Sequence, residues 1–252
     1  MSSDIWTQCE GRSELRRMRL TPWRVVESQH QIATRKLVDT LAEQALLEEL
    51  IDGAKPPDTV KGGLHYLLST PFRYPPLRNG SRFGSRHERG IWYGAETVAT
   101  AMSEVAYYRF VFLAGTTAVL DRISLDLTAF RARTHTSHAV DLVSEPFAAY
   151  RNAVASPTSY QATQALGAAM RADGVQLCRF PSARDPAAGV NVAVFASAVF
   201  GRGAPYAFQN WRCTIAGNLV EMLRRDHLTR ESMEFQRDVF LVNGNLPVPA
   251  LM

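Results

Sequence analysis

The stretch IWYGAETVATAMSEVAYY, residues 91–108, decides the fold class. Its first five residues are apolar or aromatic and predict a buried strand over 91–95. Small and apolar residues then recur at helical spacing from about Thr97 to Phe110, which predicts a helix. Strand-like runs occur on both sides of this unit. The pattern indicates an α+β fold in which helices flank a mixed, curved β-sheet.

Similar patterns predict the other elements. Helices are expected at 30–51 and 158–172, and strands at 64–68, 72–74, 118–123, 139–143, 175–180 and 190–199, with two or three more within 206–242 that close on VFLV. Residues 1–22 are polar and predict irregular structure. The first helix meets a stop at Gly53. We expect residues 1–55 to form an N-terminal helical extension that packs on a domain spanning 56–252.

Composition narrows the class of protein. The chain has 252 residues, 46% of them hydrophobic, which is enough for a large domain with its own core. No apolar run reaches the roughly 18 residues of a membrane helix, and the N-terminus lacks the apolar core of a signal peptide. We therefore expect a soluble, cytoplasmic protein. The net charge of +4 is small, and no basic helix or stripe suggests a nucleic-acid surface.

Metal, disulfide and dinucleotide-fold motifs are missing from the sequence. The three cysteines, Cys9, Cys178 and Cys213, form no CxxC pair, and the two later ones lie in apolar stretches typical of a core. The histidines form no HExxH set, and His135 and His138 fall in a polar segment predicted as a loop. No GxGxxG follows a predicted strand. We expect neither a metal nor a resident cofactor.

An arginine-rich loop is the first candidate for chemistry. Residues 76–89, PLRNGSRFGSRHER, place Arg82 between Gly80 and Gly84, and Arg73 ends the predicted strand before them. Guanidinium groups bind phosphate oxygens bidentately, and glycines let backbone amides approach an anion. The ordinary alternative is a solvated basic loop.

Two further groups are candidates. Tyr93 lies near the end of the strand at 91–95, and Glu104 lies in the following helix among apolar neighbours, where a carboxylate needs a partner or a function. The alternative is a surface salt bridge. Ser182 lies in the loop RFPSARDPAAG, residues 179–189, where turn formation is the alternative because no GxSxG elbow is present.

Taken together, these pieces resemble the RES-domain family of bacterial toxins that are paired with Xre-type antitoxins. The matching segments are Arg73-Tyr74, Gly80-Ser81-Arg82-Phe83, Trp92-Tyr93-Gly94-Ala95, Ala101-Met102-Ser103-Glu104, Pro181-Ser182-Ala183-Arg184 and Asn191 to Phe195. They cover roughly residues 64–200 in the family's order. Phe83 stands where the family commonly has tryptophan. The literal tripeptide Arg230-Glu231-Ser232 is unrelated to the family name.

The resemblance implies a fold similar to that of ADP-ribosyltransferases and a toxin that consumes NAD+ as its substrate. The bond between nicotinamide and ribose would be broken, with water or inorganic phosphate as acceptor. A cognate Xre-type antitoxin is the implied partner, nucleic acid is contacted only through that antitoxin, and a homo-oligomer is compatible with the family. No membrane association is implied.

The resemblance also implies roles for the residues. Glu104, Arg73 and Ser182 form the catalytic set, and Tyr74, Arg82, Tyr93, Arg184 and Asn191 form the substrate-binding set. Glu104 would stabilise the positive charge that develops on the ribose, the arginines would bind phosphate, and Ser182 would orient an oxygen rather than attack. Three alternatives stay open: transfer of ADP-ribose to a protein or nucleic acid, a nucleic-acid-binding or RNA-cleaving protein, and a non-catalytic interaction module.

Overall fold

The computed structural model describes residues 4–28, 38–54, 63–74, 80–117, 121–226 and 231–249. Its strands are β1 (Arg16–Leu20), β2 (Trp23–Glu27), β3 (Trp92–Ala95), β4 (Ile123–Arg131), β5 (Thr134–Asp141), β6 (Leu177–Pro181), β7 (Val190–Val194), β8 (Tyr206–Ala216), β9 (Leu219–Arg224) and β10 (Ser232–Gln236). Its helices are α1 (Ile5–Gln8), α2 (Leu41–Ala54), α3 (Tyr66–Arg73), α4 (Val98–Ala114), α5 (Arg151–Val154) and α6 (Gln161–Ala172), with 3-10 turns η2 (Phe147–Tyr150), η3 (Ser197–Phe200) and η4 (Arg237–Phe240).

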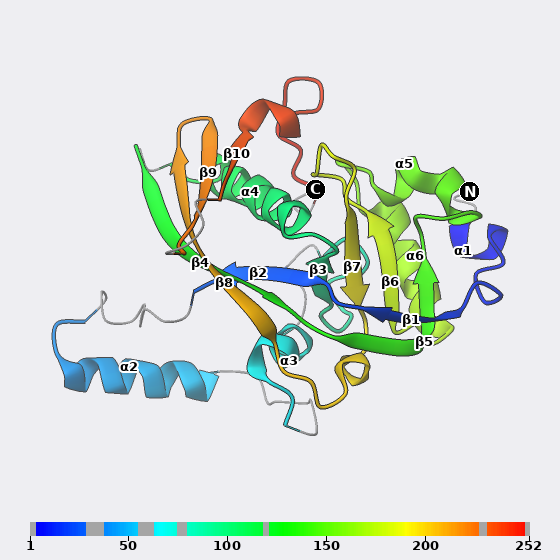
Figure 1. The fold of residues 1–252 in the computed structure, drawn as a ribbon, viewed down its shortest axis with the longest axis horizontal. Helices are drawn as coiled ribbons and strands as arrows, with labels where there is room; N and C mark the ends of the chain where they lie inside the picture. The colour runs from blue at the N-terminus through cyan, green and yellow to red at the C-terminus, as the bar shows by residue number, and fades with distance from the viewer. Residues whose placement is uncertain are drawn as a thin grey trace.

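All ten strands form one sheet in the order β1-β5-β6-β7-β3-β2-β4-β8-β9-β10 (Figure 1). The β5–β6 pair is parallel and the other neighbouring pairs are antiparallel. The expected α+β class with a mixed sheet is thereby confirmed. At the centre, β2 and β3 pair only at Trp23 and Ala95, whereas β2 pairs with β4 over five positions. The sheet therefore opens between β2 and β3 into two halves.

Alternating side chains divide the core between the two faces of the sheet. On β6, Cys178 and Phe180 join a cluster that packs against α1 and α6, while Leu177 points to the opposite face. Helix α4 covers the second half of the sheet on the same side as α6, and its Phe110 belongs to the same buried cluster as Trp211 of β8. Helix α3 packs on the other side through Leu68 and Phe72. Helices α3 and α4 thus lie on opposite faces.

Most elements predicted from residue 91 onward are confirmed, with shifted ends. The strand at 91–95, the helices near 97–110 and 158–172 and the burial of Cys178 and Cys213 agree with the structure. The strand expected at 118–123 begins at Ile123, since 118–120 lie outside the described residues. The segment VFLV, residues 239–242, does not form a closing strand, because its first two residues belong to η4.

The predicted strands at 64–68 and 72–74 were wrong, because α3 covers most of both segments. His65 begins this helix by accepting a hydrogen bond at Nδ1 from the backbone N–H of Leu67. Leu68 and Phe72 are four residues apart and bury the same face. Short apolar runs do not distinguish a strand from a buried helix, which explains the error.

The N-terminal segment also differs from expectation. Residues 1–22 were predicted to be irregular, but 5–8 form α1 and 16–20 form β1. Strand β1 is polar because it is an edge strand that pairs only with β5. His135 and His138 lie in β5 rather than in a loop. The division of the chain at residue 55 stays a prediction, although β1 and β2 are hydrogen-bonded into the sheet.

Helix α2 stands apart from the sheet in Figure 1. It begins at Leu41 and includes Gly53, which was expected to end it, and residues 30–37 of the predicted helix lie outside the described residues. Leu46 and Leu50 are exposed, so the expected packing of its apolar face on the domain is not observed among the described residues. None of the described helices is both long and apolar enough to span a membrane.

Candidate functional site

A cavity of about 640 Å³ lies where the sheet opens between β2 and β3. Both strands line it, and helices α3 and α4 add walls from the two faces of the sheet. Five of the sequence-predicted residues line this cavity: Tyr74, Arg82, Tyr93, Glu104 and Asn191. The split in the sheet therefore brings together residues that are far apart in the chain.

Helix α4 carries the carboxylate of the site. Thr97 lies two residues after the end of β3 and caps the helix, because its Oγ1 accepts a hydrogen bond from the N–H of Thr100 at 3.0 Å. Ala101, Glu104 and Tyr108 then follow at helical spacing and line the cavity. Among the described residues, Glu104 is the only acidic residue that lines it.

Glu104 is held by two donors at one oxygen. Ser182 Oγ and Asn191 Nδ2 each lie 2.6 Å from Glu104 Oε1. In the described part of the chain, no hydrogen bond reaches Glu104 Oε2. One oxygen therefore fixes the carboxylate, and the other is available to a ligand.

The hydroxyl of Ser182 is fully used within the protein. Ser182 Oγ accepts hydrogen bonds from the N–H groups of Arg184 at 3.1 Å and Asp185 at 3.0 Å, and it donates to Glu104. Ser182 is buried and does not line the cavity. This geometry suits a residue that positions Glu104 and does not suit a nucleophile.

The loop after Ser182 is locked against α4. Thr100 Oγ1 donates to Asp185 Oδ2 at 2.7 Å, and Ser103 Oγ donates to the carbonyl oxygen of Arg184 at 2.6 Å. Gly189 is required here because a Cβ atom would lie 2.2 Å from Thr100 Oγ1. These contacts fix the position of Ser182 relative to the helix that carries the carboxylate.

Arg184 does not line the cavity, unlike the prediction for a substrate-binding residue. Its guanidinium lies 3.6 Å from the centre of the Tyr107 ring, and its Nη2 donates to the carbonyl oxygen of Pro157 at 2.8 Å. The side chain is buried. Arg184 therefore joins the serine loop to α4 and to the segment before α6.

Arg82 lines the cavity and is buried. Its Nη1 donates to the carbonyl oxygens of Val154 and Ser156 at 2.9 and 3.0 Å, and its guanidinium lies 4.8 Å from the Tyr160 ring centre. No carboxylate in the described ranges pairs with it. Backbone oxygens and a ring thus hold a cation whose charge is not neutralised within that part of the protein.

Tyr93 supports the turn that carries Arg82. Its Oη forms a hydrogen bond with Ser81 Oγ at 2.9 Å and accepts one from the N–H of Phe83 at 3.1 Å. Burial raises the pKa of Tyr93, so the phenol is neutral at pH 7. Its ring lines the cavity and lies edge-to-face with Phe180, with 6.3 Å between ring centres.

Arg73 and Tyr74 separate at the end of α3. Tyr74 lines the cavity and is exposed. Arg73 is the last residue of α3 and does not line the cavity, and its guanidinium lies 6.0 Å from the Tyr74 ring centre. The structure therefore does not bring Arg73 together with Glu104, and its catalytic role stays a prediction.

Arg24 of β2 is a candidate that the sequence prediction missed. It lines the cavity, its Nη1 donates to the carbonyl oxygen of Tyr93 at 2.9 Å, and its guanidinium lies 5.2 Å from the Trp92 ring centre. Burial lowers its pKa to about 10, which leaves it charged at pH 7. No described carboxylate pairs with it. The sequence feature that points to Arg24 is that it is the single charged residue in the otherwise apolar run at 23–26.

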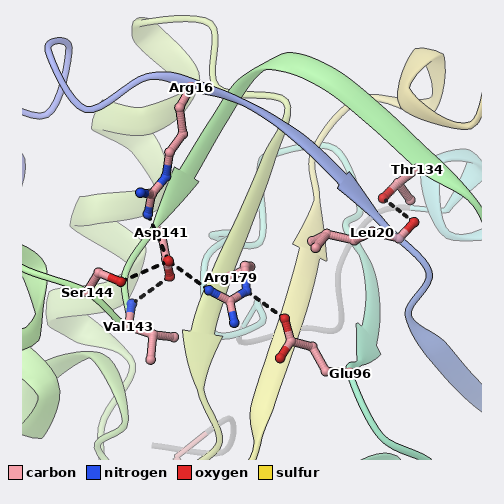
Figure 2. A network of polar contacts seen from close by, with 8 residues as sticks. All are labelled: Arg16, Leu20, Glu96, Thr134, Asp141, Val143, Ser144 and Arg179. Atoms are coloured by element: carbon pink, nitrogen blue, oxygen red, sulfur yellow. Dashed lines mark hydrogen bonds and ion pairs between the residues drawn. The ribbon is translucent and has the colours of Figure 1, made fainter.

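Figure 2 shows a network of ion pairs that joins β1, β5 and β6 to the segment after β3. Arg179 of β6 donates from Nε to Glu96 Oε1 at 2.6 Å and from Nη1 to Asp141 Oδ2 at 2.7 Å. Arg16 of β1 pairs with the same Asp141 oxygen at 2.8 Å. Glu96 immediately precedes the cap of α4, and Arg179 lies three residues before Ser182. The network therefore links the two segments that carry Glu104 and Ser182.

The fold and site define an α+β protein with a carboxylate and two arginines in a cavity at the centre of a split sheet. Residues 56–216 match the family model described as the RES domain, so the chain belongs to the RES domain family. A chain of the M. tuberculosis MbcT–MbcA toxin–antitoxin complex is similar at 17% identity and a TM-score of 0.46, over 82% of this chain and 91% of that chain. No curated protein matches the sequence.

Proposed function

We propose that this protein is a toxin that consumes NAD+ by cleaving its nicotinamide–ribose bond, with water or inorganic phosphate as acceptor. The observation that carries the proposal is Glu104, fixed by Ser182 and Asn191 in a cavity that also contains Arg24 and Arg82. Membership of the RES domain family supports the toxin role and neutralisation by a cognate Xre-type antitoxin.

The chemistry needs only one carboxylate. The bond between ribose C1′ and the pyridinium nitrogen breaks with its electron pair going to the nitrogen, so nicotinamide leaves neutral without a proton. Positive charge then develops on the ribose, where the free oxygen of Glu104 can stabilise it. The new C1′–O bond comes from water, which releases a proton to solvent, or from a phosphate oxygen. No second acid is required.

Arg24 and Arg82 suit the anionic groups of this reaction. A buried cation is costly without a counter-charge, and a bound phosphate would supply one through charge-assisted hydrogen bonds. Arg24 is assigned to the pyrophosphate of NAD+, and Arg82 to the phosphate nearest the ribose or to an incoming phosphate. Tyr93 and Phe180 offer aromatic edges and faces to the nicotinamide ring.

Purified protein incubated with NAD+, with and without phosphate, tests the proposal when the products are identified by mass spectrometry. We expect nicotinamide release in both cases, with ADP-ribose formed in water and its 1-phosphate formed if phosphate is the acceptor. Glu104→Gln keeps the size of the side chain and removes its charge, so NAD+ loss should stop while the unfolding temperature stays near that of the wild type.

Glu221→Gln in β9 is the matched control, because Glu221 does not line the cavity, and it should consume NAD+ normally. Consumption of NAD+ by Glu104→Gln at the wild-type rate would contradict the mechanism. Co-expression with the cognate antitoxin should restore growth to cells that make the wild-type protein, and Glu104→Gln should not arrest growth at all.

A further inference from the structure

Exposed tyrosines of this protein gather at one place. Among the described residues, the tyrosines with the largest exposed fractions are Tyr66 at 52%, Tyr108 at 48% and Tyr74 at 37%, and all three line the cavity between β2 and β3. Exposed aromatic rings that share the wall of one cavity indicate a surface for a flat, apolar ligand group.

Helix α3 and the residue that follows it present two of these rings. Tyr66 and Thr70 are one turn apart on the same face of α3, and Tyr74, which follows the helix with an extended backbone, lines the same cavity. Leu67 and Pro71 beside them also line the cavity. The opposite face of α3 is buried against the sheet. The wall that α3 offers to the cavity therefore carries aromatic and apolar groups and no charge.

The polar groups lie further along the same cavity. Glu104 is half-buried and its partner Asn191 is only 5% exposed, whereas Tyr66 is 52% exposed, which places the carboxylate further inside the cavity than the ring of Tyr66. Glu104 belongs to α4 on one face of the sheet, and α3 packs on the other face. Arg24 of β2 lies at the opening between the halves of the sheet, where it donates to the carbonyl oxygen of Tyr93.

We propose that the cavity wall formed by Tyr66 and Thr70 of α3 and by Tyr74 directly after it binds the adenosine of a dinucleotide whose pyrophosphate lies at Arg24 and whose other ribose lies at Glu104. This inference rests on the proposed function and names the part of the substrate that α3 recognises. The order carboxylate, guanidinium and uncharged aromatic wall matches ribose, pyrophosphate and adenine along such a ligand. The protein is therefore selective for dinucleotides over mononucleotides.

The test compares NAD+ with nicotinamide mononucleotide, which has the scissile bond but lacks adenosine. Stacking of a base on an aromatic side chain changes affinity by about 5- to 150-fold. Tyr66→Ala and Tyr74→Ala should therefore raise KM for NAD+ by about tenfold and leave KM for the mononucleotide unchanged. Tyr66→Phe keeps the ring and should keep the wild-type KM. Phe112→Ala is the matched control, since Phe112 of α4 is 60% exposed and lies outside the cavity.

A second measurement separates this inference from the proposed function. AMP binding, followed by calorimetry, should be detectable for the wild type and about tenfold weaker for Tyr66→Ala, whether or not NAD+ is cleaved. If the protein cleaves NAD+ but both alanine variants keep the wild-type KM, or lose both substrates equally, the adenosine site is refuted and the reaction stands. If NAD+ is not cleaved, the reaction is refuted, and AMP titration alone decides the adenosine site.

Discussion

Ser182 donates its hydroxyl proton to Glu104 across 2.6 Å, and two backbone N–H groups hold the same hydroxyl from the other side. The proton is thereby directed at the carboxylate, and the oxygen lone pairs are occupied. A serine in this state acts through Glu104. The loop in which it lies is a turn, as the composition suggested, and that turn is also part of the site.

Ser182→Ala should lower kcat and leave KM for NAD+ nearly unchanged. A hydrogen bond to a charged group contributes about 1.5–3 kcal/mol, so the expected loss is about 10- to 150-fold. Steady-state kinetics measures it, and mass spectrometry should find no covalent adduct on Ser182 in the wild type. Ser124→Ala, which removes a hydroxyl in β4 beside Thr214, is the control and should be fully active. An adduct on Ser182 would overturn the positioning role.

Asn191→Ala removes the second donor to Glu104 Oε1 and should reduce kcat to a similar degree. Because both side chains act on one oxygen, their effects should not add in the double variant. A double-mutant cycle on kcat measures this coupling. Strict additivity of the two losses would show that Ser182 and Asn191 do not hold Glu104 as a unit.

The sequence predicted the residues around Glu104 better than it predicted the rest of the cavity. Glu104, Ser182 and Asn191 were selected together through the ordered family segments, and the structure joins all three by hydrogen bonds. Arg24 was missed because the sequence pattern predicts irregular structure over 1–22 and no strand where β2 lies. Its significance depends on the sheet opening between β2 and β3, which no local pattern reveals.

Arg24→Gln should raise KM for NAD+ by about tenfold or more while kcat changes less, since the charge-assisted contact to pyrophosphate is lost. Arg212→Gln is the control, because Arg212 of β8 is also partly buried but is paired with Asp126 and does not line the cavity. Arg73→Ala should raise KM less than Arg24→Gln does, because the Arg73 side chain does not line the cavity. A large KM effect for Arg73 and none for Arg24 would restore the original sequence interpretation.

Substitution of Arg179 tests whether its ion pairs with Glu96 and Asp141 help to position Glu104 and Ser182. Arg179→Met removes the contacts to Glu96 and Asp141 and should lower both kcat and the free energy of unfolding, the latter by about 1–3 kcal/mol. Arg179→Lys should recover part of kcat. Arg212→Met breaks a comparable pair in the other half of the sheet and should lower stability without lowering kcat. If Arg179→Met and Arg212→Met lose equal amounts of kcat for equal losses of stability, Arg179 has only a structural role.

Tyr93 predicts how stability depends on pH. Burial raises its pKa above the ordinary value of about 10, so the unfolded chain releases this proton first as the pH rises. Stability from the neutral phenol is therefore fully present below about pH 10 and is lost as the pH rises from there toward the folded-state pKa, by up to about 1.4 kcal/mol per pH unit.

Tyr93→Phe lacks this proton, so its free energy of unfolding should fall less steeply between about pH 10 and 11 than that of the wild type. Urea unfolding at closely spaced pH values measures both slopes, with the difference at pH 7 reporting only the lost hydrogen bonds to Ser81 and Phe83. Parallel slopes would show that Tyr93 ionises with the same pKa in the folded and unfolded chains.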